Sequence, residues 1–315
     1  MAQPRILTFN FHEPYLCLMA KTGLQIDAGH YEEGFLARQW HAMFRPIPQN
    51  ISIVREAEWK RRIEENYYDV IIAQNEMNAL DVARAKCGKL LLCHNRRTFL
   101  NTTASNVDGK DPLEAFNRLL EYLQEGFEFL FISESKRDDY RIPGRVILPG
   151  IDVDDYGGYR GEEAAAIRVG NTMRQRTLMF DVDFQEKVCA GVPNRVIGIN
   201  PDIPGAGYAK SWEELKEIYR HFRCMLHVTR EEYEDGYNLS MLEAMATGMP
   251  VVSLANATSP LTDGIDGFVS ADSDVLRARL RELLENPDLA REIGTRGRET
   301  IASKFSIEAF CTKWR

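Results

Sequence analysis

Short apolar runs alternate with stretches of helical period along most of the chain. In the first half, several runs have the length and unbroken apolar character of strands buried on both faces of a sheet. These runs lie at residues 5–11, 69–73, 89–94, 129–132 and 145–148. The helix-like stretches between them lie at residues 56–67, 78–86 and 112–126. Strands and helices that alternate at this spacing predict βαβ units and a parallel sheet covered by helices.

The same alternation begins again after residue 160. Strand-like runs lie at residues 164–169, 194–198, 224–228 and 250–253, and helix-like runs at 211–221, 239–247 and 274–286. Between the two halves, residues 149–161 read PGIDVDDYGGYRG, a segment rich in Gly, Asp and Pro that is typical of a linker. We therefore predict two doubly wound α/β domains, residues 1–150 and 151–315, with an interdomain cleft. Ligands of such sheets bind beyond the carboxyl ends of the strands.

Composition and charge limit the classes of protein to which this chain can belong. The chain has 315 residues, of which 44% are hydrophobic and 27% charged, values ordinary for a globular enzyme with a sizeable core. The net charge of −8 disfavours a nucleic acid as the partner, because phosphate electrostatics supply most of that affinity. No run has the roughly 18 apolar residues of a membrane helix, and MAQPRILTFNF does not resemble a signal peptide. These features predict a cytoplasmic protein without a membrane span.

Residues 231–248, EEYEDGYNLSMLEAMATG, combine an acidic cluster with an apolar helix. Acidic residues near a helix N-terminus interact favourably with the helix dipole, by up to about 1 kcal/mol. This explains Asp235, which precedes the helix. It does not explain Glu243, which lies inside the helix between Leu242 and Ala244. Glu243 is either a glutamate on an exposed face of the helix or a residue with a specific partner.

Several segments together resemble a known family. They are ISES at 132–135, LPGID at 148–152, SWEELKEIYRHFRCMLHVT at 211–229, DGYNLSMLEAMATGMPVVS at 235–253 and DGIDGFVS at 263–270. In this order and spacing they resemble the retaining nucleotide-sugar glycosyltransferases of family 4 (group 1). Members of that family have the GT-B fold, which consists of two Rossmann-like domains. The resemblance is strong over residues 130–315 and weak before them, and residues 235–253 are its most specific part.

The resemblance implies roles for the acidic helix and for the residues that lead into it. The family has two acidic residues eight positions apart, and the second binds the ribose hydroxyls of the donor. Glu243 occupies that second place, and Asp235 stands where the family normally has a Glu that contacts the donor sugar. The residues between them suit a diphosphate, because the helix N-terminus offers N–H groups and a partial positive charge. These residues are Gly236, Tyr237, Asn238 and Leu239.

The resemblance also implies cationic residues after the first strand of the second domain. The family has an Arg and then a Lys there, which neutralise the pyrophosphate. In the segment GNTMRQR, Asn171 replaces the Arg, so Arg174 or Arg176 has to supply the charge, and Arg176 has the spacing of the Lys. A cation is needed because charge develops on the β-phosphate as the glycosidic bond breaks. In the first domain, His94 corresponds to a histidine that faces the donor sugar.

Other residues are candidates for the acceptor side. Glu134 and Ser135 of the ISES segment are expected to line the cleft. The family's first strand leads into a glycine-rich loop, but this chain has NFHEPY instead, with His12 and Glu13 in the loop position. These two residues either contact an acceptor or only cap the following helix.

The final segment, residues 304–315, has apolar residues at helix-like intervals. In the family the terminal helix packs back on the first domain, and the apolar residues of KFSIEAFCTKWR allow this or a simple capping helix.

The DVD strings at 152–154 and 181–183 imitate a metal-binding motif of other glycosyltransferases. One lies in the linker and the other precedes a helix, where acidic residues act as caps, so we predict no metal site.

These inferences predict a retaining glycosyltransferase that transfers a hexose from a UDP- or GDP-sugar to a hydroxyl acceptor. The acceptor is a saccharide, a lipid-linked compound or a small molecule. The resemblance implies no obligatory cofactor or metal and no protein nucleophile. Two alternatives remain: a nucleotide-sugar epimerase, and a non-catalytic nucleotide-sugar-binding protein of the same fold. A dinucleotide-dependent dehydrogenase is disfavoured because neither half begins with a strand, GxGxxG and a helix.

Overall fold

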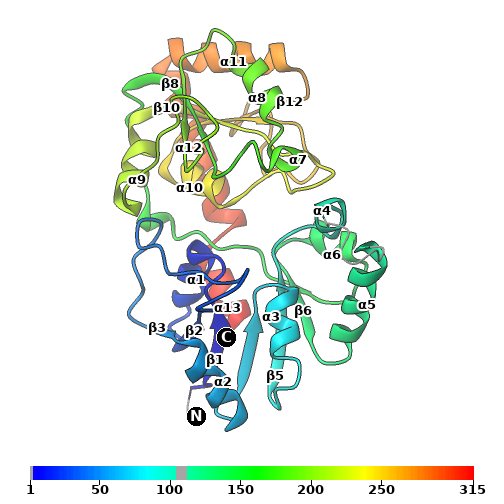
Figure 1. The fold of residues 1–315 in the computed structure, drawn as a ribbon. Helices are drawn as coiled ribbons and strands as arrows, with labels where there is room; N and C mark the ends of the chain where they lie inside the picture. The colour runs from blue at the N-terminus through cyan, green and yellow to red at the C-terminus, as the bar shows by residue number, and fades with distance from the viewer. Residues whose placement is uncertain (1–2, 104–111) are drawn as a thin grey trace. The chain divides into compact units, whose positions relative to one another are not determined.

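The computed structural model describes residues 3–103 and 112–315 (Figure 1). The chain divides into two compact units: unit 1 contains Met1–Pro149 and Phe310–Arg315, and unit 2 contains Gly150–Ala309. Each unit is built on a parallel β-sheet with helices packed against it. The predicted α/β class with two doubly wound sheets is therefore confirmed. Within the described ranges, no helix is both long enough and apolar enough to cross a membrane.

In unit 1, the described residues form a seven-stranded parallel sheet of order β3-β2-β1-β4-β5-β6-β7. Its strands are β1 (Ile6–Phe9), β2 (Ile26–Gly29), β3 (Ile51–Val54), β4 (Val70–Ala73), β5 (Gly88–Cys93), β6 (Glu128–Phe131) and β7 (Arg145–Val146). Its helices are α1 (Glu13–Ala20), α2 (Glu56–Glu64), α3 (Glu76–Asp81), α4 (Arg97–Thr103), α5 (Pro112–Gln124) and α6 (Glu134–Tyr140). The strand order reverses between β1 and β4, because β2 and β3 extend on one side of β1 and the later strands on the other.

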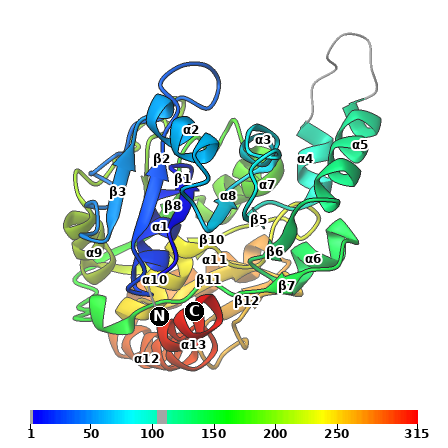
Figure 2. The same ribbon diagram turned by 90° about the horizontal axis from the view of Figure 1, so that it is seen from below.

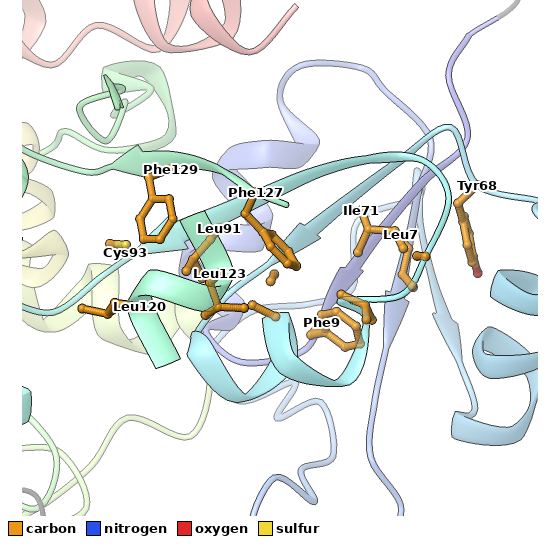
Figure 3. Packing of buried hydrophobic residues seen from close by; sticks show 14 of the residues in the cluster. Leu7, Phe9, Tyr68, Ile71, Leu91, Cys93, Leu120, Leu123, Phe127 and Phe129 are labelled. Atoms are coloured by element: carbon orange, nitrogen blue, oxygen red, sulfur yellow. The ribbon is translucent and has the colours of Figure 1, made fainter. Parts of the chain in front are cut away.

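One face of this sheet buries a continuous apolar core (Figure 3). Leu7, Phe9, Ile71, Leu91 and Phe129 project from alternate positions of the strands and are almost fully buried. Helices α2, α3 and α5 cover them and contribute the buried residues Trp59, Ala79, Leu120 and Leu123 to the core. Each large apolar side chain buried in this way contributes about 1.5–3 kcal/mol. This core fixes the strands whose carboxyl ends carry the candidate residues of unit 1.

The opposite face of the unit 1 sheet is covered by α1 and by the end of the chain. The last helix, α13 (Ile307–Trp314), leads to the C-terminus (Figure 2). Within it, the Phe310 ring meets the Tyr15 ring of α1 edge-on, with centroids 5.9 Å apart. The Arg315 guanidinium donates hydrogen bonds of 3.0 and 2.8 Å to the carbonyl oxygen of Thr22. Residues from the end of the chain thus complete a unit formed mainly by its beginning.

In unit 2, the described residues form a five-stranded parallel sheet of order β12-β11-β10-β8-β9. Its strands are β8 (Glu163–Val169), β9 (Asn194–Ile197), β10 (Phe222–His227), β11 (Val251–Leu254) and β12 (Phe268–Ser270). Its helices are α7 (Thr177–Phe180), α8 (Val182–Cys189), α9 (Trp212–His221), α10 (Leu239–Thr247), α11 (Ser273–Glu285) and α12 (Pro287–Lys304), with a 3-10 turn at Val153–Asp155. The strand order reverses between β8 and β10.

The close approach of α10 and α12 is a main feature of unit 2. Helix α10 ends at Gly248, whose φ of 94° is the left-handed conformation that terminates many helices. Gly294 of α12 packs directly on this turn. A Cβ atom added to Gly294 would lie only 1.9 Å from the carbonyl oxygen of Gly248. Only a glycine at position 294 therefore permits this packing.

Helix α10 has the predicted bounds, whereas other elements differ. The helix predicted at residues 78–86 is α3, which Asn75 caps through its side chain and which ends at Asp81. The helix predicted at 56–67 ends at Glu64, and Asn66 adopts a left-handed φ of 53° just beyond it. Strands β2, β3 and β12 and the long helix α12 were not predicted. These strands are short, and β2 contains Asp27 and Gly29, which weaken the apolar signal.

Candidate functional site

The candidate residues of unit 2 gather at the carboxyl ends of β8, β10 and β11. The strand order reverses between β8 and β10, and such a switch point is where parallel α/β sheets bind ligands. Asn171 follows β8, and the segment from Asp235 to Asn238 follows β10. A hydrogen bond from the Gly236 N–H to the Thr258 hydroxyl joins the segments after β10 and β11. Sequence positions more than 60 residues apart thus lie at the same edge of the sheet.

Helix α10 carries the predicted ribose ligand, Glu243. The helix begins at Leu239 because the side-chain oxygen of Asn238 accepts hydrogen bonds from the Met241 N–H (2.9 Å) and the Ser240 hydroxyl (2.7 Å). Glu243 is only 4% exposed, and the residues on either side of it are fully buried. A carboxylate removed from bulk water is costly unless polar partners compensate. This burial distinguishes Glu243 from an ordinary acidic residue on a solvent-facing helix surface.

Backbone and hydroxyl groups fix the turn that contains Asp235. Asp235 is 1% exposed, and its carbonyl oxygen accepts a hydrogen bond of 2.7 Å from the Thr229 hydroxyl. The N–H of Gly236 donates to the Thr258 hydroxyl at 2.7 Å. A Cβ atom at Gly236 would lie 2.7 Å from the backbone nitrogen of Ser259. The Gly236 N–H therefore already has a partner in the protein, and the sequence did not reveal the role of Thr258.

The Thr258 hydroxyl provides a test of this turn. We expect Thr258→Val to destabilise the protein by about 1–2 kcal/mol, because the buried Gly236 N–H loses its acceptor. Chemical denaturation monitored by tryptophan fluorescence measures the change. Thr295→Val is a matched control, since that exposed hydroxyl bonds to the Arg291 carbonyl of its own helix, and it should stay within about 0.5 kcal/mol. Equal stability of the two variants would contradict the proposed support of the turn.

The two candidate cations of unit 2 differ in environment. Arg174 is exposed, whereas Arg176 is partly buried. The Arg176 guanidinium lies over the Phe180 ring, 4.9 Å from its centroid, and burial lowers the pKa of this group. Arginine keeps its charge at neutral pH even in such surroundings. Arg176 is consequently the more firmly positioned of the two.

Asn171 has a structural contact that the sequence could not show. Its side-chain oxygen accepts a hydrogen bond of 2.8 Å from the Ile199 N–H, which follows β9. Nearby, Asn200 accepts from the Met173 N–H at 2.8 Å and donates to the Gly170 carbonyl at 2.6 Å. Two asparagines therefore connect the loops after β8 and β9. A role of Asn171 in donor binding stays a prediction.

In unit 1, His94 follows β5 and lies among aromatic rings. Its Nε2 atom is 2.7 Å from the Gln74 side-chain oxygen. The Tyr15 ring meets it edge-on at 4.9 Å, and the His12 ring stacks on it at 5.8 Å. Burial holds the pKa of His94 well below its usual value, and the nearby charges of His12 and Lys136 lower it further. His94 is therefore a neutral imidazole at pH 7.

The remaining candidates of unit 1 lie at the starts of helices. His12 caps α1, since its Nδ1 atom accepts the Tyr15 N–H at 3.2 Å, as in the second of the two roles considered for it. Glu13 is 4% exposed, and its Oε1 atom accepts the His41 N–H at 3.4 Å. Glu134 and Ser135 form the first turn of α6. Contact of these four residues with an acceptor stays a prediction.

The first aspartate of each D-x-D string caps the N-terminus of a helix or a 3-10 turn. Asp181 caps α8 through the Phe184 N–H at 3.2 Å, and Asp152 caps the 3-10 turn through the Asp154 N–H at 3.1 Å. In residues 3–103 and 112–315, no group of three or more His, Cys, Asp or Glu side chains is arranged to hold a metal ion.

Comparisons with known proteins agree with this arrangement. Residues 184–314 match the family model described as glycosyl transferase-like. The poly(ribitol-phosphate) alpha-N-acetylglucosaminyltransferase of Staphylococcus aureus is 33% identical over 113 residues, which are 34% of this chain and 22% of that protein. The MMP alpha-(1->4)-mannosyltransferase of Mycolicibacterium hassiacum is 36% identical over 80 residues, 24% of this chain and 20% of that protein. The chain thus matches about a fifth of the length of these curated relatives.

Solved structures show the same fold over nearly the whole chain. HepE of Anabaena, crystallised with UDP and glucose, has a TM-score of 0.72 at 12% identity and covers 99% of this chain and 98% of its own. WaaG, a glycosyltransferase involved in lipopolysaccharide biosynthesis, has a TM-score of 0.68 at 12% identity, and 98% of each chain is covered. The chain therefore has the GT-B fold. The match of residues 184–314 to the glycosyl transferase-like family model agrees with the predicted resemblance to group 1 glycosyltransferases.

Proposed function

We propose that this protein is a retaining glycosyltransferase that transfers a hexose from a UDP- or GDP-sugar to a hydroxyl acceptor. The observation that carries the proposal is the burial of Glu243, which is 4% exposed on a helix that starts at the switch point of the unit 2 sheet. A carboxylate there suits a ribose, because its oxygens accept hydrogen bonds from both ribose hydroxyls. The family match over residues 184–314 supports the same assignment.

The proposed diphosphate site lies at the N-terminus of α10. The N–H of Met241 is bonded to Asn238, and that of Gly236 to Thr258. The diphosphate is therefore assigned to the N–H groups of Leu239 and Ser240, in the first turn of the helix. Arg176, with Arg174 as the second cation, supplies the positive charge. In this proposal Asp235 contacts the hydroxyls of the transferred hexose and His94 faces the same sugar.

The proposed chemistry requires electrostatic stabilisation rather than a nucleophile. As the bond between the sugar and the diphosphate breaks, negative charge develops on the β-phosphate, and Arg176 and the helix N-terminus stabilise it. The departing phosphate accepts the proton of the acceptor hydroxyl, which attacks on the same face of the sugar and so retains its configuration. No carboxylate is assigned as a nucleophile, in contrast to retaining glycosidases.

The first experiment is a calorimetric titration with UDP, GDP and ADP. Binding of UDP or GDP at micromolar to low millimolar concentration is expected, and failure of all three to bind at millimolar concentration would contradict the proposal. Incubation with radiolabelled UDP-glucose, UDP-N-acetylglucosamine and GDP-mannose then separates the alternatives. Transfer or slow hydrolysis releases the nucleotide, an epimerase yields an isomeric nucleotide sugar, and a binding protein leaves the donor intact.

Metal independence is tested by chelation. We expect the rate of nucleotide release to change by less than about twofold after treatment with EDTA, because in this proposal arginine and helix N–H groups stabilise the leaving diphosphate. Release of UDP or GDP from the donor before and after chelation, with Mg²⁺ and Mn²⁺ added back separately, measures this. A loss that either ion restores would show that a divalent cation takes part.

A further inference from the structure

A chain of buried hydrogen bonds in unit 1 leads to His94. The Thr8 hydroxyl in β1 donates to the carbonyl oxygen of Ile72 in β4 at 2.9 Å. The Gln74 amide nitrogen lies 2.7 Å from the same hydroxyl, and the Gln74 carbonyl oxygen lies 2.7 Å from His94 Nε2. Thr8 is fully buried and Gln74 is 1% exposed. Because both side chains are buried, the directions of these hydrogen bonds follow from the donor and acceptor groups themselves.

The direction of each hydrogen bond follows from the first one. A threonine hydroxyl has a single proton, and Thr8 donates it to Ile72. The same hydroxyl can therefore only accept a bond from Gln74, which must turn its NH₂ group toward Thr8 and its oxygen toward His94. Because an amide oxygen only accepts, His94 Nε2 must carry the proton. In a neutral imidazole the lone pair is then on Nδ1.

We propose that Gln74 is a positioning residue that holds His94 as the Nε2–H tautomer, so that Nδ1 accepts a hydrogen bond from a hydroxyl of the donor sugar. The role of the sugar rests on the proposed function, whereas the tautomer depends only on the chain from Thr8 to His94. The opposite tautomer would place an Nδ1–H donor toward the ligand and two lone pairs against each other at Gln74. Gln74 thus selects one of two otherwise similar states of the imidazole.

The surroundings of His94 determine how it titrates. His12 stacks on it with ring planes 14° apart, Tyr15 meets its edge, and the charge of Lys136 from α6 acts on it. Cys93 precedes it in β5 with a buried thiol. Burial disfavours the imidazolium most, and the electrostatic effects of His12 and Lys136 disfavour it further. The neutral form and its single acceptor nitrogen are therefore retained at physiological pH.

The tautomer can be measured without any ligand. In ¹⁵N-labelled full-length protein, two-bond ¹H–¹⁵N correlation spectra at pH 7.5 should show His94 Nε2 protonated and Nδ1 unprotonated. Gln74→Met, which removes the acceptor but keeps the side-chain length, should yield a mixture of tautomers or the Nδ1–H form. Gln74→Glu keeps an acceptor and should retain the Nε2–H form. Asn50→Leu controls for the loss of a partly buried amide, since the Asn50 side chain donates to the backbone carbonyls of Ala20 and Leu24.

Kinetics then test the positioning role. Hydrolysis of the best-bound donor from the panel of UDP-glucose, UDP-N-acetylglucosamine and GDP-mannose should lose about 10- to 100-fold in kcat in Gln74→Met, with a small change in KM. In Gln74→Glu the carboxylate should raise the pKa of His94, because it favours the imidazolium. Its rate should therefore match the wild type at high pH and fall as the pH drops through the raised pKa.

Each outcome decides the inference. An Nδ1–H tautomer in the wild type, or an unchanged tautomer in Gln74→Met, overturns it. A Gln74→Met protein with an altered tautomer but full kcat also overturns it, because the lone pair would then not serve the donor sugar. Should Gln74→Met lower Tm by more than Asn50→Leu does, the pH profile of Gln74→Glu decides instead. Failure of the protein to bind any nucleotide refutes the proposed function but not the tautomer, because the spectra of the free protein test the tautomer without a ligand.

Discussion

Glu243→Gln is expected to raise the dissociation constant for UDP or GDP about 100-fold. The substitution keeps the size of the side chain and removes its charge, so the two hydrogen bonds from the ribose become weaker neutral ones. A loss of about 1.5 kcal/mol for each bond gives a change of this order. Titration calorimetry of the wild type and the variant with the same nucleotide measures it.

Glu299→Gln is the matched control for this change. Glu299 is an exposed glutamate on α12, so its replacement should leave the dissociation constant within about twofold. Both variants should unfold at nearly the wild-type temperature, which separates lost binding from lost structure. Unchanged nucleotide affinity in Glu243→Gln would refute the ribose assignment, and with it the main support for the proposed donor site.

Gly294→Ala should lower the unfolding temperature of unit 2 by about 5–10 °C. The added Cβ atom would lie 1.9 Å from the Gly248 carbonyl oxygen and 3.2 Å from Pro250 Cδ. The clash involves backbone that terminates α10, so a side-chain rotation cannot relieve it. Alanine favours a helix over glycine by about 1 kcal/mol, but overpacking against backbone that cannot move aside costs about 3–5 kcal/mol, so the net loss is about 2–4 kcal/mol. Differential scanning calorimetry measures the shift, at roughly 2–4 °C for each kcal/mol.

Gly207→Ala provides the comparison, because a Cβ atom at that position would have no neighbour within 4 Å. It should change the unfolding temperature by no more than about 1 °C. If Gly294→Ala behaved in the same way, the two helices would be farther apart than the structure places them. A milder defect in nucleotide binding should accompany the destabilisation, because α10 also carries Glu243.

The elements predicted best from the sequence are those whose own residues determine them. Helix α10 has Asn238 as a cap, an apolar body and Gly248 as its end, so its bounds could be predicted to the residue. The buried central strands have unbroken apolar runs and were also predicted. By contrast, β3 is an edge strand with only Ile51 and Val54 buried. Pairing with β2 stabilises it, and a single segment gives no sign of that partner.

The site residues likewise differ in how well the sequence alone predicts them. Glu243 could be predicted as a site residue, because an acidic residue inside an otherwise apolar helix is unusual. Gln74 gave no such signal, since its importance depends on Thr8, 66 positions earlier, and on His94, 20 positions later. The contact of Asn171 with the loop after β9 likewise depends on a neighbour in space. Hydrogen bonds between strand ends are set by sheet order, which individual segments do not encode.

The contacts of Phe310 and Arg315 have a consequence for biosynthesis. Tyr15 and Thr22 are translated early, but the residues that cover them are translated only after the whole of unit 2. Domains usually fold as they leave the ribosome, N-terminal first. Here the first unit to emerge waits for Phe310–Arg315, so its native packing is completed only after unit 2 has been synthesised.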